Sequence, residues 1–175
     1  LQLFRQWGSP TPGHPELCVK RGVENSSGPL GQGHTYGIGA AIAAKFLAAR
    51  TGNPTFNKET IYIYISDGGI QEEISQGAAR IAAVLGLDNL IMFYDSNDIQ
   101  LSTETGEVMN ENTAAKYRAL GWEVLEINGN DAAEIRKAIE AAKAVTGKPT
   151  LIIGKCIMGK GALKADGTSY ERNCK

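Results

Sequence analysis

The stretch "YIYISDGGIQEE", residues 62–73, contains the transition on which the fold depends. Its first half is a run of β-branched and aromatic residues, a composition typical of a buried strand. The run stops at Asp67, which lies between Ser66 and two glycines, and two glutamates follow. Acidic side chains are favoured near the positive amino-terminal end of a helix, so residues 71–87 are predicted to form one.

Strand and helix patterns continue to alternate on both sides of this stretch. An alanine-rich segment with apolar residues at helical spacing precedes it and ends at Gly52. Asp131 stands where the N-cap of a later helix is expected. Helices are predicted at 34–50, 71–87, 110–119 and 131–145, and strands at 60–65, 89–94, 122–127 and 149–155. This order predicts a doubly wound α/β fold, a mainly parallel sheet with helices on both faces.

The predicted elements form a single domain that spans residues 1–175. Residues 1–33 are rich in proline and glycine and are predicted to be extended loops, and residues 34–155 form the α/β core. Residues 156–175 are predicted to be a loop-like tail. Because the chain starts at Leu1 without a methionine, we expect it to be a piece of a longer protein.

Composition excludes several classes of partner. The 18 basic and 19 acidic residues nearly cancel, so no nucleic-acid footprint is indicated. No apolar run reaches the roughly 20 residues of a membrane span, because Lys45 interrupts the longest candidate. Cys18, Cys156 and Cys174 are odd in number and widely scattered, which favours a reduced cytoplasm over a disulfide framework or a zinc site.

Polar side chains follow two successive strands of the predicted sheet. Asp67 ends the first strand, and Asn97 follows the second one thirty residues later. Carboxyl ends of parallel strands share one edge of the sheet, which is where ligands bind in such folds. Carboxylate and amide oxygens suit Mg²⁺, and Gly68 lets backbone amides approach a diphosphate. The alternative interpretation is an ordinary turn or helix cap at Asp67 and a plain loop at Asn97.

Six motifs together resemble the cofactor-binding domain of transketolase, in order and in spacing. They are "FRQWGSPTPGHPE", "GVENSSGPLGQG", "SDGGIQEEIS", "FYDSNDIQLS", "AAKYRALGWEVLEINGND" and "KPTLIIGK". The resemblance covers residues 4–155, nearly the entire chain. It implies the thiamin diphosphate-binding fold, in which Asp67 belongs to a Gly-Asp-Gly signature followed some thirty residues later by an asparagine. This sequence departs from the signature at its first position, which is Ser66.

The resemblance also implies a cofactor site with named residues. Asp67 and Asn97 would ligate Mg²⁺, or Ca²⁺ or Mn²⁺ in its place, through their side chains, and Ile99 would do so through its carbonyl. Gly68 would contact the diphosphate through its amide. The cofactor-binding residues implied are Gly28, Leu30, Asp67, Gly68, Asn97, Ile99 and Leu101. For the loop around Gly28, a plain connection before a helix remains the alternative.

Two catalytic residues follow from the same resemblance. His14 lies between two prolines, which stiffen its position, and matches the family histidine that faces the hydroxyl groups of the substrate. Glu72 matches the family glutamate of a proton-sharing network near the dimer interface, and Glu73 stands where glycine is usual. Without the family, His14 would be an incidental loop histidine and Glu72 a helix-dipole acid. His34, where the family has an apolar residue, is expected to lie at a helix start.

The activity implied is transfer of a two-carbon ketol unit from a ketose phosphate to an aldose phosphate, as in the pentose phosphate pathway. The pyrimidine-binding domain of a second subunit would complete the site, in a homodimer of the full-length enzyme or as a separate C-terminal subunit. The chain is therefore expected to be inactive alone.

Three alternatives to this activity stay open at this point. One is a non-catalytic or split-subunit thiamin diphosphate-binding module, and a second is an enzyme similar to 1-deoxyxylulose-5-phosphate synthase. The third is a nicotinamide-binding domain, suggested by "GIGAAIA" at residues 37–43. That run does not open a helix after a strand, so it lacks the context of a dinucleotide-binding fingerprint.

Overall fold

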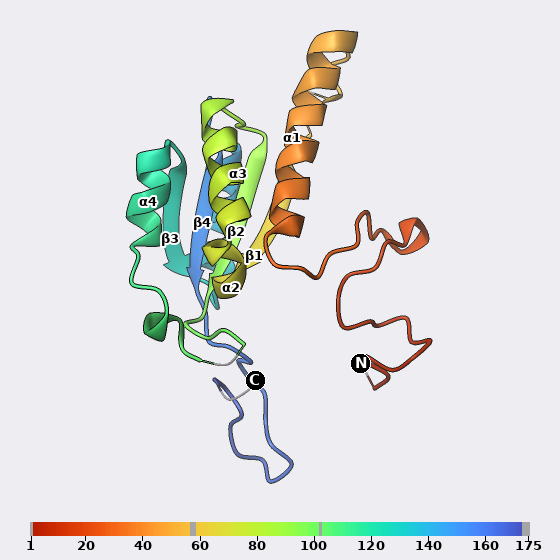
Figure 1. The fold of residues 1–175 in the computed structure, drawn as a ribbon, viewed down its shortest axis with the longest axis vertical. Helices are drawn as coiled ribbons and strands as arrows, with labels where there is room; N and C mark the ends of the chain where they lie inside the picture. Colours follow the sequence, from red (N-terminus) through yellow and green to blue (C-terminus); the bar gives the residue numbers. More distant parts are fainter. Residues whose placement is uncertain (1, 57–58, 102, 173–175) are drawn as a thin grey trace.

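A four-stranded parallel sheet forms the centre of the computed structural model, which describes residues 2–56, 59–101 and 103–172 (Figure 1). The strand order is β1-β2-β4-β3, and all three pairings are parallel. The strands are β1 (Ile61–Ser66), β2 (Leu90–Ser96), β3 (Glu123–Asn128) and β4 (Thr150–Lys155). The predicted α/β fold with a parallel sheet is confirmed.

Five α-helices accompany the sheet within the described residues. They are α1 (Gln32–Thr51), α2 (Asp67–Gln71), α3 (Glu73–Val84), α4 (Thr113–Leu120) and α5 (Ala132–Lys143). Gly52, with φ 65°, ends α1 as predicted. The Asp131 side chain accepts hydrogen bonds from the amides of the first turn of α5, so the predicted N-cap is confirmed. The short 3₁₀ helices η1 (Val19–Arg21) and η3 (Thr105–Glu107) lie in the loops.

The single helix predicted over residues 71–87 is wrong in its start, its continuity and its end. The chain enters α2 already at Asp67, and Glu72 is extended, with φ −61° and ψ 135°, so that α3 begins anew at Glu73. Side chains stabilise this break, because the Ser75 hydroxyl donates to the Gly69 carbonyl at 2.7 Å. At the other end, α3 stops at Val84 and a turn follows.

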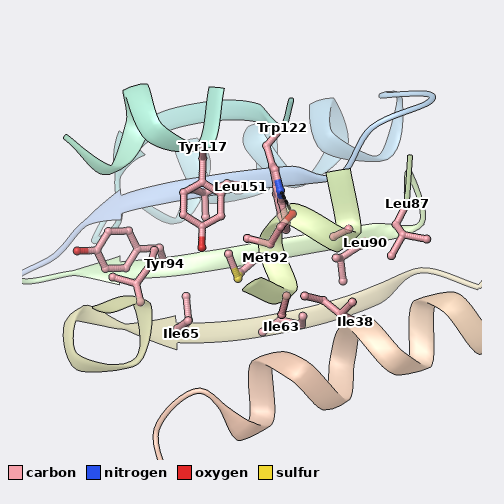
Figure 2. Close-up of a cluster of buried hydrophobic side chains, with 14 of the residues drawn as sticks. Ile38, Ile63, Ile65, Leu87, Leu90, Met92, Tyr94, Tyr117, Trp122 and Leu151 are labelled. Carbon is pink, nitrogen blue, oxygen red and sulfur yellow. Dashed lines mark hydrogen bonds between the residues drawn. The ribbon is translucent and has the colours of Figure 1, made fainter. Parts of the chain in front are cut away.

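The main core lies between one face of the sheet and the helices α1, α3 and α4 (Figures 1 and 2). Trp122, 3 % exposed, donates its indole N–H to the Ala79 carbonyl at 2.9 Å and meets the Tyr117 ring edge-on. In Figure 2, Tyr94 lies at one end of this cluster, toward the carboxyl ends of the strands. The cluster therefore reaches the sheet edge at which ligands bind in this class of fold.

The opposite face carries a smaller core, formed where α5 packs against β2, β3 and β4. Ala138 and Ala142 of α5 are buried against Ile91 and Ile152 of the sheet. Helices thus cover both faces, as predicted. The edge strand β1 alternates in burial, and on this second face its tyrosines Tyr62 and Tyr64 are 55 % and 69 % exposed.

The regions outside the core have little regular structure. Residues 2–31 contain the short helix η1 and no α-helix among those described, and residues 156–172 form a loop with one bridge between Leu163 and Ser169. Cys18 and Cys156 are free thiols, whereas Cys174 and the last residues of the predicted tail lie outside the described residues. Of the helices in the described ranges, none has the length and apolar character that crossing a bilayer requires.

Candidate functional site

The site begins where β1 and β2 end side by side. Ser66 pairs with Asp95 at the ends of these strands, and Asp67 follows immediately. The backbone amide of Asn97 donates to the Asp67 carboxylate at 3.0 Å. The structure therefore brings together the two strand-end residues that the sequence singles out.

Asp67 is a buried carboxylate with two hydrogen-bond donors. It is 1 % exposed, and the Tyr94 hydroxyl donates to its Oδ1 at 2.6 Å while the Asn97 amide donates to its Oδ2. Burial, with the hydrogen bond to Asp67, raises the pKa of Tyr94 above its usual range, so its hydroxyl remains a donor. Each carboxylate oxygen keeps a second lone pair, since it accepts one of these bonds.

A tight turn follows, from Asn97 to Ile99. The Asn97 Oδ1 accepts a hydrogen bond from the Ile99 amide at 3.0 Å, the geometry of an Asx turn. Asp98 between them has φ 66°, in the left-handed region that aspartate tolerates better than most residues. Both Asn97 and Ile99 are buried, at 8 % and 6 % exposure, so this part of the loop has a defined geometry next to Asp67.

A cleft of about 530 Å³ opens above these groups. It is lined by most of the residues that the sequence predicts for the site, together with three others. The predicted ones are His14, Gly28, Leu30, Gly68, Asn97, Ile99 and Leu101, and the others are Ser66, Gln100 and Met158. The cleft thus joins four parts of the chain, residues 14–30, 66–68, 97–101 and 158, at the carboxyl edge of the sheet. Asp67 does not line it; this residue lines a second cavity, of about 630 Å³, together with Tyr94 and Ser96.

Glycines allow the loops to approach one another. A Cβ on Gly68 would lie 3.1 Å from the Leu30 side chain, and one on Gly28 would lie 3.1 Å from the His14 ring. Leu30 and Leu101 are 53 % and 94 % exposed and add apolar surface to the cleft. Ser66 is extended, with φ −114°, a conformation open to serine without strain.

The side-chain oxygens of the neighbouring residues Asp67 and Asn97 suit a hard divalent cation, although the two residues line different cavities. Asp67 offers carboxylate oxygens and Asn97 an amide oxygen that are already held in place, and Mg²⁺ prefers such ligands. Within the described ranges, no group of three or more His, Cys, Asp or Glu side chains could hold a metal ion. A metal here would therefore depend on amide, carbonyl and diphosphate oxygens beside the single carboxylate of Asp67.

The structure does not place Glu72 in the cleft. It is exposed, and it occupies the extended break between α2 and α3. His34 lies in the first turn of α1, close to the expected helix start, but it is buried at 3 % exposure. Its burial lowers the pKa to about 4, and neither ring nitrogen has a partner among the described residues.

Sequence reasoning missed the residues that hold the strand-end groups. Tyr94 belongs to an apolar run whose burial was predicted, but its hydroxyl contact with Asp67 depends on how the strands align. Asp95 stands at the end of the second predicted strand, but nothing in the sequence assigns it a role. For Tyr94 and Asp95, the sequence shows only that polar atoms stand at the very end of an apolar run.

Comparisons with known proteins agree on one family. The family model of the transketolase thiamine diphosphate binding domain matches residues 1–172. A transketolase of Streptococcus pyogenes is 47 % identical over 172 residues, covering 97 % of this chain and 24 % of that protein. A Geobacillus stearothermophilus transketolase is 45 % identical, covering 97 % of this chain and 26 % of that protein.

Solved structures give the same picture. A transketolase from Campylobacter jejuni superposes with a TM-score of 0.85 at 46 % identity, over 91 % of this chain and 25 % of that one. A transketolase from Leishmania mexicana superposes with a TM-score of 0.87 at 40 % identity, over 97 % of this chain and 25 % of that one. The chain therefore spans about a quarter of the length of these relatives.

Proposed function

Since the chain belongs to the family of the transketolase thiamine diphosphate-binding domain, we propose that it supplies the diphosphate-binding half of a transketolase active site. The reaction is transfer of a two-carbon ketol unit from a ketose phosphate to an aldose phosphate. The observation that carries this proposal is the hydrogen bond from the Asn97 amide to the buried Asp67 carboxylate, next to the cleft that Asn97 lines. The names of the relatives favour transketolase over the related 1-deoxyxylulose-5-phosphate synthase.

In this proposal the neighbouring strand ends at Asp67 and Asn97 hold Mg²⁺ and the cofactor diphosphate. Asp67 and Asn97 ligate the ion through side-chain oxygens and Ile99 through its carbonyl. Ca²⁺ or Mn²⁺ can replace Mg²⁺ because both are bound by the same kind of oxygen ligand. Gly68 leaves room for the diphosphate near the backbone, because it has no Cβ.

The walls of the cleft hold the rings of thiamine diphosphate. Leu30 and Leu101 offer apolar contact, and Gly28 offers backbone without side-chain cover. When bound, thiamine diphosphate supplies the nucleophilic carbon and the electron sink that cleavage of the ketose carbon–carbon bond requires. This chain's residues hold and orient that group and limit the access of water to it.

His14 and Glu72 are the proposed catalytic residues of this chain. His14 lines the cleft and is exposed, so it can donate to or accept from substrate hydroxyl groups. Glu72 is exposed at the break before α3, which leaves its carboxylate free to join a network across a subunit interface.

A second polypeptide region completes the proposed site. The pyrimidine-binding domain of a second subunit covers the cleft, either in a homodimer of a full-length enzyme or as a separate C-terminal subunit. The substrates are sugar phosphates of the pentose phosphate pathway, in the cytoplasm. On this proposal residues 1–175 act as one domain, with loops at 1–33, the core at 34–155 and a tail at 156–175.

A ketol-transfer assay tests this function. The chain is mixed with a protein that carries a pyrimidine-binding domain, and xylulose 5-phosphate and ribose 5-phosphate are supplied with thiamine diphosphate and Mg²⁺. We expect transfer with the partner and none with either protein alone. His14→Ala should slow transfer and leave cofactor binding intact. Cofactor binding without transfer in any full-length or mixed preparation would instead favour a non-catalytic binding module.

A further inference from the structure

Asp95 is a carboxylate beside the cofactor cleft to which the proposed mechanism gives no role. It is the penultimate residue of β2, and it does not line the cleft. Its two oxygens accept different hydrogen bonds. The Asn97 Nδ2 donates to Oδ1 at 3.1 Å, and the Tyr64 hydroxyl donates to Oδ2 at 3.0 Å.

The contact with Asn97 decides which end of its carboxamide is available to a metal. A carboxamide has an oxygen, which can ligate a cation, and an NH₂ group, which cannot. Asp95 can only accept, so it selects the NH₂ group of Asn97. The Ile99 amide can only donate, and it selects the oxygen. Both neighbours favour one orientation, in which Oδ1 keeps a lone pair for a further partner.

Tyr64 supports Asp95 from the open face of the sheet. Its ring stacks on Phe93, with centroids 5.4 Å apart and planes within 8° of parallel. Although the residue is 69 % exposed, this stacking directs its hydroxyl to Asp95. Partial burial and the nearby carboxylate of Asp95 raise the pKa of Tyr64, which keeps the hydroxyl protonated and donating.

We infer that Asp95 is a positioning residue for the metal site. Asp95 holds the Asn97 carboxamide so that its oxygen is available to Mg²⁺, and Tyr64 in turn holds Asp95. The inference rests on the proposed function, because it gives Asn97 the role of a ligand. Residues that hydrogen-bond to a metal ligand without touching the metal fix the orientation of that ligand and contribute to metal affinity. Asp95 itself does not touch the ion.

A double-mutant cycle tests this role. Mg²⁺ is titrated calorimetrically into the full 175-residue chain with saturating thiamine diphosphate, for wild type, Asp95→Ala, Asn97→Ala and the double variant. Asp95→Ala should weaken Mg²⁺ binding by about 10–100-fold. Adding Asp95→Ala to Asn97→Ala should weaken it no further, because Asp95 acts through Asn97. A merely structural role would instead weaken binding by the same factor in both backgrounds.

Tyr64→Phe provides a second variant that keeps the ring stack and removes only the hydroxyl. We expect it to weaken Mg²⁺ binding several-fold, whereas Tyr62→Phe, on the same strand and face, should leave binding unchanged. Melting temperatures without ligand establish that each variant is folded.

Two results would contradict the inference in different ways. Metal-dependent cofactor binding that survives intact in Asp95→Ala and Tyr64→Phe would remove the positioning role alone. Thiamine diphosphate binding to wild type that does not depend on Mg²⁺ would remove the proposed metal site, and the positioning role with it.

Discussion

At the scale of single residues, Tyr94 connects the hydrophobic core to Asp67, a residue of the proposed cofactor site. Its ring is part of the main core, and its hydroxyl donates to Asp67 at 2.6 Å. Tyr94→Phe should lower Mg²⁺ affinity about 10-fold, because Asp67 loses a fixed orientation. It should also lower the free energy of unfolding by about 1–3 kcal/mol, through loss of a buried hydrogen bond to a charged group.

Tyr117→Phe is the matched control for Tyr94→Phe. Tyr117 is fully buried in the same core, but its hydroxyl has no partner among the described residues. Removing that hydroxyl should leave Mg²⁺ affinity unchanged and should not reduce stability. Calorimetric titration and urea unfolding measure both quantities, and equal losses in the two variants would contradict the role given to Tyr94.

His34 makes the stability of the fold depend on pH. Its pKa is lowered by burial to about 4, whereas a histidine in the unfolded chain titrates near pH 6.5. Between pH 6.5 and pH 4 the His34 ring is therefore protonated in the unfolded state but not in the folded state. The free energy of unfolding keeps the whole contribution of His34 above pH 6.5 and falls as the pH decreases toward 4. Linkage sets the loss at roughly 3 kcal/mol, as an upper limit.

Urea unfolding between pH 7.5 and pH 4 measures this dependence. His34→Leu should remove most of the slope and should stabilise the protein at neutral pH, because two buried ring nitrogens without partners disappear. The exposed His14, changed to Ala, should keep the slope of the wild type. A slope that persists in His34→Leu would assign it to other groups.

The sequence could predict Asp67 and Asn97 as neighbours because both follow strands that share one edge of the sheet. It could not predict the contacts of Tyr94 and Asp95, since these depend on the register of β1 against β2. Neither could it predict that His34 would be buried with no hydrogen-bond partner among the described residues. That outcome depends on how α1 packs against the rest of the core.

At the scale of elements, the break between α2 and α3 is the feature that periodicity alone could not reveal. Apolar spacing continues through Glu72, so a single helix is the natural prediction over residues 71–87. The break instead depends on side chains of α3 that satisfy carbonyls of α2, chiefly Ser75 with Gly69. The order of strands and helices was predictable from the sequence. The exposure of Tyr62 and Tyr64 was not, because it follows from the packing of α5 against the other three strands, β2, β3 and β4.

Ser75→Ala tests what stabilises this break. The hydroxyl is fully buried, and without it the Gly69 carbonyl loses its 2.7 Å donor. We expect the free energy of unfolding to fall by about 1–3 kcal/mol, measured by urea unfolding. The exposed Ser26, changed to Ala, should cost less because water can replace its contacts. Equal losses of unfolding free energy in the Ser75 and Ser26 variants would mean that the Ser75 hydrogen bond does not specifically stabilise the break between α2 and α3.

At the scale of the whole molecule, the parallel order of the strands creates the site. Because β1 and β2 are adjacent and parallel, a carboxylate and an amide lie side by side at their ends, and residues of the loops 14–30 and 97–101 line the cleft next to that amide. Fold class and most of the cleft residues were predictable from motif order. The position of Glu72 outside the cleft could not be predicted, because it depends on the break between α2 and α3.

The most direct test of the account is calorimetric titration of thiamine diphosphate into this chain, with and without Mg²⁺, for wild type and Asp67→Ala. Asp166→Ala, which changes an exposed tail aspartate, is the control for loss of a carboxylate. We predict Mg²⁺-dependent binding in wild type and Asp166→Ala, and loss of that dependence in Asp67→Ala. Unchanged Mg²⁺-dependent binding in Asp67→Ala would contradict the assignment of the metal–diphosphate site.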